Sequence, residues 1–247
     1  MGSVLFHERL EVYQRYLTVT GQCEDLIARA SASIAAFDHL ERAMESIGVN
    51  LMRANAQKPG SPQRALYLDV SIASTHECAA SLDVCLSRRV AEAKTHEGLL
   101  MGLWRIRGML LGMKRGKAGC VREERAAYGS PAFPFANLDM YRIALQGVGW
   151  IDELLAELNP KARVRRKLDI STTGTVLNIG EGHGRTTPAD QNRFMKTAEE
   201  HAFQTVLMLD LLVARQEVNA SRVEGGKAIQ ARVVSMLHAW CARNGGV

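Results

Sequence analysis

Leu10-Glu11-Val12-Tyr13-Gln14 reappears further along the chain as Leu138-Asp139-Met140-Tyr141-Arg142, an offset of 138 − 10 = 128 residues. Self-similarity at a fixed long period indicates a duplicated structural unit. The same offset relates further pairs without gaps: Asn50 and Asn178, Gln63 and Gln191, and Val90 and Val218. The 247-residue chain is therefore expected to contain two copies of one unit.

Apolar residues recur at three- and four-residue spacings in each copy, which is typical of amphipathic helices and not of strands. The expected core-facing residues of the first copy are Phe6, Leu10, Tyr13 and Leu17; Leu40, Met44, Ile47, Leu51 and Ala54; Leu66, Val70, Ala73, Ala80 and Val84; and Leu99, Leu103, Ile106, Leu110 and Met113. Breaks at Lys58-Pro59-Gly60 and Thr186-Thr187-Pro188 separate the second helix of each copy from the third. Four such helices bury their apolar stripes best by packing antiparallel around a shared core. The sequence predicts an all-α fold of two tandem up-down four-helix bundles.

The predicted division of the chain has three parts: copy one over 1–114, a linker over 115–137 and copy two over 138–247. The linker is indicated by its glycines and prolines, which are Gly116, Gly119, Gly129, Pro131 and Pro134. Phe133 and Phe135 lie near its end and are candidates for docking on a bundle.

Composition excludes several classes of protein. The five cysteines are scattered without a CxxC pair, which disfavours a disulfide framework or a zinc site. No Glu has a His three residues later, so the ligand pattern of di-iron bundles is missing, and we expect no metal and no cofactor. No apolar run approaches the roughly 20 residues that a membrane span requires. The start of the chain lacks a secretory signal pattern, so a cytoplasmic protein is expected.

Copy two contains Asn178-Ile179-Gly180-Glu181-Gly182-His183-Gly184-Arg185, followed by Asn192-Arg193-Phe194. Copy one keeps Ser46-Ile47-Gly48-Val49-Asn50-Leu51 and then loses the rest of the pattern. Together with the Leu-x-x-Tyr opening of the first helix and the order of four helices, this resembles the small four-helix-bundle family of the ribosomal RNA intervening-sequence protein and the accessory variability protein of diversity-generating retroelements. Members of that family are oligomeric, basic and non-catalytic, and some associate with RNA and a reverse transcriptase. The resemblance implies the same properties for this chain, here as a tandem duplication.

The glycine-rich segment around Gly182 has two readings. Successive glycines let backbone amides approach a phosphate, and Arg185 would add a charged fork. A phosphate loop, however, lies between a strand and a following helix, whereas this segment ends a helix. A glycine C-cap and a tight turn held by Glu181 paired with Arg185 is therefore favoured. Asn50 and Asn178 are expected to have a structural role beside it.

A catalytic site is not expected. Glu77 falls on the predicted apolar stripe of the third helix, where a carboxylate must be paired or protonated. The 128-residue offset places Thr205 at the corresponding position of copy two, so no repeated acid exists there. No spacing supports a Ser-His-Asp or Cys-His arrangement, and the chain is predicted not to be an enzyme.

Basic residues gather in two stretches of a chain whose formal net charge is +5. The first stretch holds Arg163, Arg165, Arg166 and Lys167, where copy one has mostly uncharged residues. Cations at a helix start oppose the helix dipole and favour an external anion. The second stretch holds Lys114, Arg115, Lys117, Arg122 and Arg125. Whether the two stretches share a face is left open by the sequence.

The predicted function is a non-catalytic nucleic-acid-binding adapter. It would hold structured RNA, or a reverse transcriptase or other nucleic-acid enzyme with its RNA, mainly through phosphate contacts. The expected nucleic-acid-binding residues are Arg163, Arg165, Arg166, Lys167, Arg185, Lys114, Arg115 and Lys117. The alternative is a purely structural scaffold whose bundle faces form an oligomer. A homo-oligomer without membrane contact is expected in either case.

Overall fold

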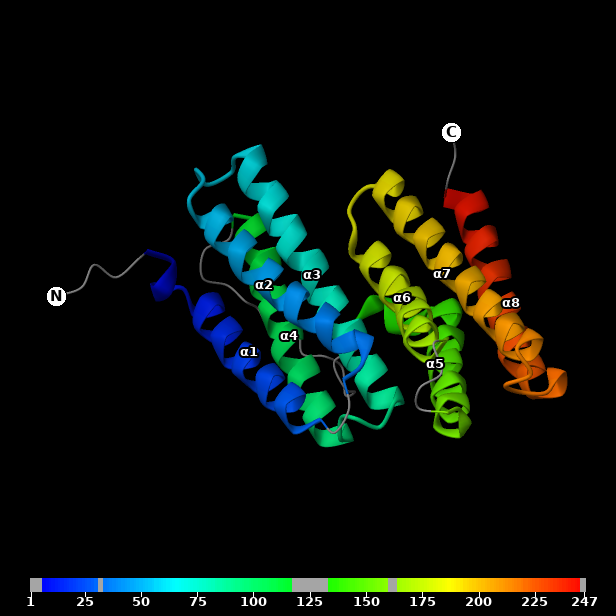
Figure 1. Ribbon diagram of the computed structural model, residues 1–247. Coiled ribbons are helices and arrows are strands. Elements are labelled where there is room, and N and C mark those ends of the chain that lie inside the picture. Colours follow the sequence, from blue (N-terminus) through cyan, green and yellow to red (C-terminus); the bar gives the residue numbers. More distant parts are fainter. Residues whose placement is uncertain (1–5, 31–32, 117–132, 160–163, 245–247) are drawn as a thin grey trace.

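The computed structural model describes residues 6–30, 33–116, 133–159 and 164–244 (Figure 1). These residues form helices and contain no strand, which confirms the all-α class. Two short 3-10 helices, η1 (Phe6–Arg9) and η2 (Pro134–Asn137), precede α1 and α5. The α-helices are α1 (Glu11–Arg29), α2 (Ala35–Asn55), α3 (Pro62–Ser87), α4 (Ala93–Lys114), α5 (Asp139–Glu157), α6 (Val164–Gly184), α7 (Pro188–Ala214) and α8 (Ala220–Asn244).

The second set of four helices repeats the first. η1 and η2 begin 134 − 6 = 128 residues apart, and α1 and α5 begin 139 − 11 = 128 residues apart. α1 and α5 each have 19 residues, and α2 and α6 each have 21. The third helix of each copy has the same kind of N-cap. The hydroxyl of Ser61 accepts a hydrogen bond from the backbone amide of Arg64, and the hydroxyl of Thr187 accepts one from the backbone amide of Asp190. Both caps are followed by proline, as the predicted breaks require.

The expectation of a gapless offset is wrong beyond the second helix. Helix three ends in both copies with a residue of positive φ, Arg89 in copy one and Gln216 in copy two, and 216 − 89 = 127. The amides of Val90 and Glu217 close the same turn onto the carbonyls five residues before them. Val90 therefore corresponds to Glu217 and not to Val218. The connection between helices two and three is three residues shorter in copy two, 185–187 against 56–61, but α6 ends one residue later than α2 and α7 is one residue longer than α3, so the offset falls by one.

The predicted core stripes are confirmed in some helices and wrong in others. All five predicted residues of α2 are buried, from Leu40 to Ala54. In α1 the stripe is wrong: Leu17 is 46% exposed, and the buried side chains are Val12, Val19, Cys23 and Leu26. Leu66 of α3 is also outside the core, with 55% of its surface exposed.

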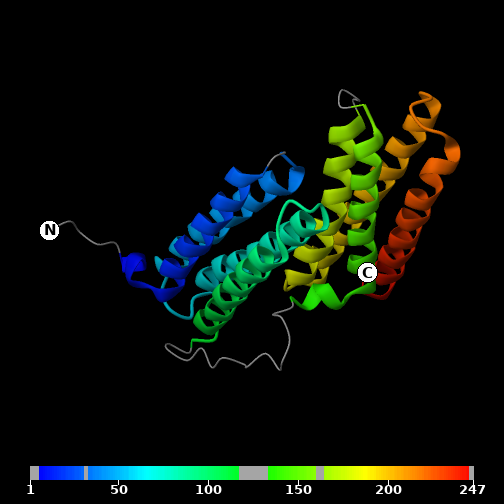
Figure 2. The same cartoon turned by 90° about the horizontal axis from the view of Figure 1, so that it is seen from below.

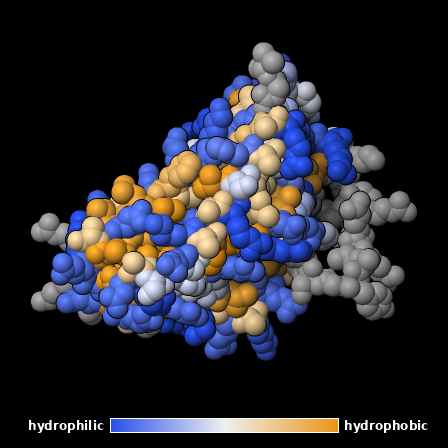
Figure 3. Space-filling model, turned by 90° about the vertical axis from the view of Figure 1, so that its right-hand side faces the viewer, coloured by the Kyte–Doolittle hydropathy of each residue, from blue (hydrophilic) through white to orange (hydrophobic). Residues whose placement is uncertain are grey.

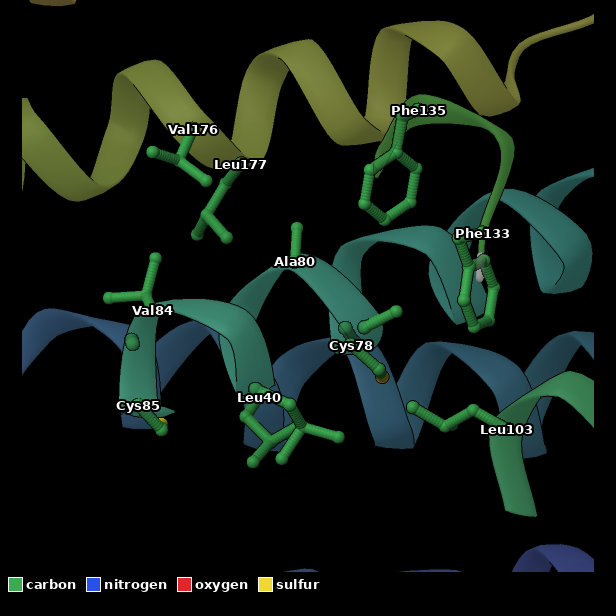
Figure 4. Close-up of a cluster of buried hydrophobic side chains, with 14 of the residues drawn as sticks. Leu40, Cys78, Ala80, Val84, Cys85, Leu103, Phe133, Phe135, Val176 and Leu177 are labelled. Carbon is green, nitrogen blue, oxygen red and sulfur yellow. The ribbon is translucent and has the colours of Figure 1, made fainter. Parts of the chain in front are cut away.

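The two copies share one cluster of core residues, and a second cluster, which includes Leu154, Leu168 and Leu209, lies within copy two. α3 lies against both α2 and α6, and α6 also packs on α5 and α7 (Figures 1 and 2). One cluster of buried apolar side chains contains Leu40, Leu82 and Leu103 of copy one together with Val176 and Leu177 of copy two. Phe133 and Phe135 are buried in it, which confirms that the end of the linker docks (Figure 4). Because the first cluster contains residues of both copies, the division into two separate bundles stays a prediction.

Candidate nucleic-acid interface

The glycine-rich segment lies inside α6 and not in a turn. The helix continues to Gly184, so the predicted turn at Gly180 and Gly182 is wrong. A Cβ at Gly180 would lie 2.9 Å from the Cβ of Ala80, and one at Gly182 would lie 2.8 Å from the Cβ of Phe194. A Cβ at Gly184 would lie 2.8 Å from the Cγ of His76. These glycines let α3 and α7 approach α6 closely at its last two turns.

Asn50 and Asn178 make the same bond in the two copies. The side-chain amide of Asn178 donates to the carbonyl of Gly174 over 2.8 Å, and that of Asn50 donates to the carbonyl of Ser46 over 2.9 Å. Asn50 is 8% exposed. Each amide therefore satisfies a carbonyl four residues earlier on its own helix, a geometry that suits the structural role expected of both.

Two guanidinium groups, one just after α6 and one in α7, contact the same aromatic ring in α7. Arg185 pairs with Glu181, as expected. Its guanidinium carbon lies 4.6 Å from the centroid of the Phe194 ring, and that of Arg193 lies 4.8 Å from the same centroid. Burial, and next to it the charge of Glu77, raise the pKa of the Glu181 carboxyl. Glu181 is the ion-pair partner of Arg185, while Arg193 pairs with Asp190.

A second group of basic side chains, Arg107 of α4, His76 of α3 and His183 of α6, lies where α3 meets the other two helices. The Arg107 guanidinium donates through Nε to Nε2 of His76 over 3.0 Å, so this imidazole nitrogen is unprotonated. Burial first, then the positive charge of Arg107, lowers the pKa of His76 to about 3. Burial and Arg107 also lower the pKa of His183, while burial and Arg115 lower the pKa of Arg107. The lowered pKa values favour neutral imidazoles, which leaves Arg107 as the positive charge of this group.

The structure brings the predicted stretch that begins at Lys114 to the same end of the molecule as Arg185. Lys114 and Arg115 are exposed at the end of α4, and Lys114 lies 2.5 Å from Asp69. The positive charge of Arg115 helps to lower the pKa of Arg107, and that of Arg107 helps to lower the pKa of His183, which is two residues from Arg185. Lys117 lies outside the described residues. We call the set Arg107, Arg115, His183, Arg185 and Arg193 the α6-end cluster.

The predicted stretch of Arg163, Arg165, Arg166 and Lys167 lies at the opposite end of α6. A helix of 21 residues is about 30 Å long, which separates Arg165 from Arg185. Arg165 is half-buried, and its Nη1 donates to the carbonyls of Leu155 and Leu158, the latter over 3.0 Å. It therefore caps the end of α5. Arg166 and Lys167 are exposed, and Arg163 lies outside the described residues.

Sequence reasoning missed Arg107 and His76. Arg107 adjoins Ile106 of the predicted stripe, and nothing in the sequence showed that it would meet a histidine 31 residues away. The carboxylate singled out, Glu77, is half-buried and lies 3.2 Å from His39. In the described part of the chain no three His, Cys, Asp or Glu side chains are grouped so that they could hold a metal ion. Cys23, Cys78 and Cys85 are buried free thiols, and burial raises the pKa of each.

No protein-family model matches the chain, and no curated protein or solved structure matches it significantly. The resemblance to the four-helix-bundle family therefore stays an expectation. Among the described helices, none combines the length and the apolar composition needed to cross a membrane.

Proposed function

We propose that this chain is a non-catalytic adapter that binds structured RNA at the α6-end cluster. The observation that carries the proposal is the pair of guanidinium groups, Arg185 and Arg193, held against the ring of Phe194. A further cation, Arg107, lies close by, because it donates to His76, which packs against Gly184 at the end of α6. Closely spaced cations release counterions when they contact phosphates, which favours nucleic-acid binding.

The arrangement supports recognition by charge and shape. The Arg193 side chain is 66% exposed, and its planar guanidinium, held against Phe194, can present paired donors to a phosphate. Asp190, 3.3 Å from Arg193, is its exposed partner and is easily displaced. No exposed row of aromatic rings accompanies these cations in the described residues, so base stacking is not expected to contribute.

The cluster at the start of α6 has a smaller part in this proposal. Arg165 is engaged with backbone carbonyls, which leaves Arg166 and Lys167 as the exposed described cations of that predicted group. A reverse transcriptase or another nucleic-acid enzyme stays a proposed second partner. The scaffold alternative is favoured by exposed apolar side chains, among them Leu17, Val49, Phe203 and Leu207.

The test is RNA binding measured across a salt titration. In the variant Arg115→Glu/Arg193→Glu both exposed cations of the α6-end cluster are reversed. We expect weaker binding to a structured RNA, and a slope of log affinity against log salt that is flatter by about 0.7–0.9 for each lost phosphate contact. Arg29→Glu/Arg232→Glu is the matched control, because both residues are exposed and lie away from the cluster. Parent-like affinity and slope in the first variant would refute the proposal.

A further inference from the structure

The contact between the two copies has two sides. One side is a face of α3 that includes His76, Ala80 and Arg88. The other side is formed by α5 and α6. Gly184 and Gly180 lie against His76 and Ala80, and Nη2 of Arg88 lies 2.8 Å from Oδ1 of Asp169.

Two apolar residues complete the α5–α6 side. Leu177 points from α6 toward α3 (Figure 4). Leu145 of α5 packs partly buried against the shared core cluster, and its backbone carbonyl accepts a hydrogen bond from the hydroxyl of Ser87 at the end of α3.

The repeat places the counterpart of the α3 face on the surface of copy two. At the offset of 127 that holds for the third helices, His76, Ala80 and Arg88 correspond to Phe203, Leu207 and Arg215 of α7. Phe203 is 52% exposed, Leu207 is 53% exposed, and Arg215 is also exposed. We call these three residues the tail face. Phe203 borders a groove between α7 and α8 whose wall includes Ala228, Ala231 and Val234, on the side of the molecule seen in Figure 3.

The counterpart of the α5–α6 side is exposed on copy one. At the offset of 128, Leu145, Asp169 and Leu177 correspond to Leu17, Glu41 and Val49. Leu17 is 46% exposed, Val49 is 41% exposed, and Glu41 is also exposed. We call these three residues the head face.

These two faces account for most of the exposed apolar surface of large side chains. Six large hydrophobic side chains are exposed in the described residues: Leu17, Val49, Leu66, Ile170, Phe203 and Leu207. Four of them belong to the head or tail face. The acid and the base of the internal ion pair also have counterparts of the same sign, Glu41 for Asp169 and Arg215 for Arg88.

We propose that the tail face of one chain binds the head face of a second copy of this chain. Arg215 of one chain would then pair with Glu41 of the next, as Arg88 pairs with Asp169 inside the chain. Phe203 and Leu207 would cover Leu17 and Val49, which removes apolar surface of both chains from water. The contact is heterologous, so it builds a closed ring or an open filament rather than a two-fold dimer.

The contact between chains is wider than the one inside the chain. Gly180 and Ala80 approach closely within the chain, whereas their counterparts are Met52 and Leu207. The larger side chains hold the helices further apart, so we expect a reversible, concentration-dependent association. This inference does not depend on RNA binding.

Sedimentation velocity over a range of protein concentrations tests the proposal. The parent should sediment as species larger than one chain, and Leu207→Glu should move the population toward single chains by raising the apparent dissociation constant more than about tenfold. Leu66→Glu is the matched control, because Leu66 is exposed to a similar extent and lies on neither face. A parent that stays a single chain at every concentration, or equal effects of the two substitutions, would overturn the proposal.

Charge exchange tests the pairing itself. Glu41→Arg and Arg215→Glu should each weaken association, since each places like charges at every contact. Mixing the two variants should restore it, because each tail face then meets a head face of opposite charge. Circular dichroism checks that both variants fold, which is expected at exposed positions. Mixtures that associate no better than either variant alone would contradict the assignment of Glu41 and Arg215 to one contact.

Discussion

Tyr141, at the start of α5, donates a hydrogen bond of 2.7 Å to Oδ2 of Asp83 on α3, and so links the two copies through a buried phenol. The other oxygen of the Asp83 carboxylate lies 2.7 Å from Nε2 of His96 on α4. Burial is the main cause that raises the pKa of Tyr141, and the charge of Asp83 adds to it. One carboxylate thus joins three helices at the contact between the copies.

Tyr141→Phe should lower the free energy of unfolding by about 1.5–3 kcal/mol, the range for a hydrogen bond to a charged group. The ring still fills its place, so the loss reports the hydroxyl. Urea denaturation measures this loss, with Tyr67→Phe as the control. Tyr67 is half-buried, and phenylalanine keeps the ring whose centroid lies 5.9 Å from the guanidinium carbon of Arg53. Equal stabilities of the two variants would show that the bond to Asp83 contributes nothing.

Gly180→Ala should destabilise the protein although alanine is the better helix former. The new methyl group would lie 2.9 Å from the Cβ of Ala80, which is fixed to the α3 backbone and cannot rotate away. Overpacking of this kind costs about 1–3 kcal/mol. Gly108→Ala, in α4 with no atom within 4 Å of the added Cβ, should instead stabilise by up to about 1 kcal/mol. Thermal unfolding compares them, and stabilisation by both substitutions would mean that α6 can move away from α3.

Helix number and approximate position could be predicted from the sequence, because periodicity and the Ser61-Pro62 and Thr187-Pro188 caps act locally. The offset could not be followed beyond helix two. Loop length has little effect on the packing of the helices it joins, so copy two could lose residues in the 185–187 connection without a visible break in the apolar pattern.

The burial of α3 on two sides also could not be predicted from the sequence. This helix is buried from Ser71 to His76, including Ser74 and Thr75, because α2 and α6 cover it from two sides. Small polar side chains that bond their own helix, such as Thr75 to the carbonyl of Ile72, do not look like core residues in a hydropathy pattern. For the same reason the acceptor of Arg107, His76, could not be anticipated.

His76 should make stability fall as the pH is lowered. Its pKa in the folded protein is lowered to about 3, by burial first and then by Arg107 and His183, from an ordinary value of 6.5. Because the unfolded chain binds a proton that the folded chain refuses, the stabilising contribution is complete above pH 6.5 and is lost as the pH falls toward 3. The slope from this group reaches at most about 1.4 kcal/mol per pH unit.

The check is urea denaturation of the parent and of His76→Gln at a series of pH values. Glutamine can still accept from Arg107 but does not titrate, so the difference in stability between parent and variant should shrink as the pH falls below 6.5. His183 and His201 also have lowered pKa values and remain in both proteins, so only the difference is diagnostic. A difference that stays constant with pH would contradict a neutral, buried His76.

The start of α6 allows stability and RNA binding to be separated within one cluster. Arg165→Glu should destabilise the protein by about 1–3 kcal/mol, because it removes the donor to the carbonyls of Leu155 and Leu158 and places an acid at the C-terminus of α5. Arg166→Glu/Lys167→Glu should leave stability unchanged or slightly raised, since both side chains are exposed and acids suit the first turn of a helix. In the salt titration this double variant should affect RNA binding less than Arg115→Glu/Arg193→Glu does. If it flattens the salt dependence more, the principal phosphate contacts lie at the start of α6, and the α6-end cluster has a structural role instead.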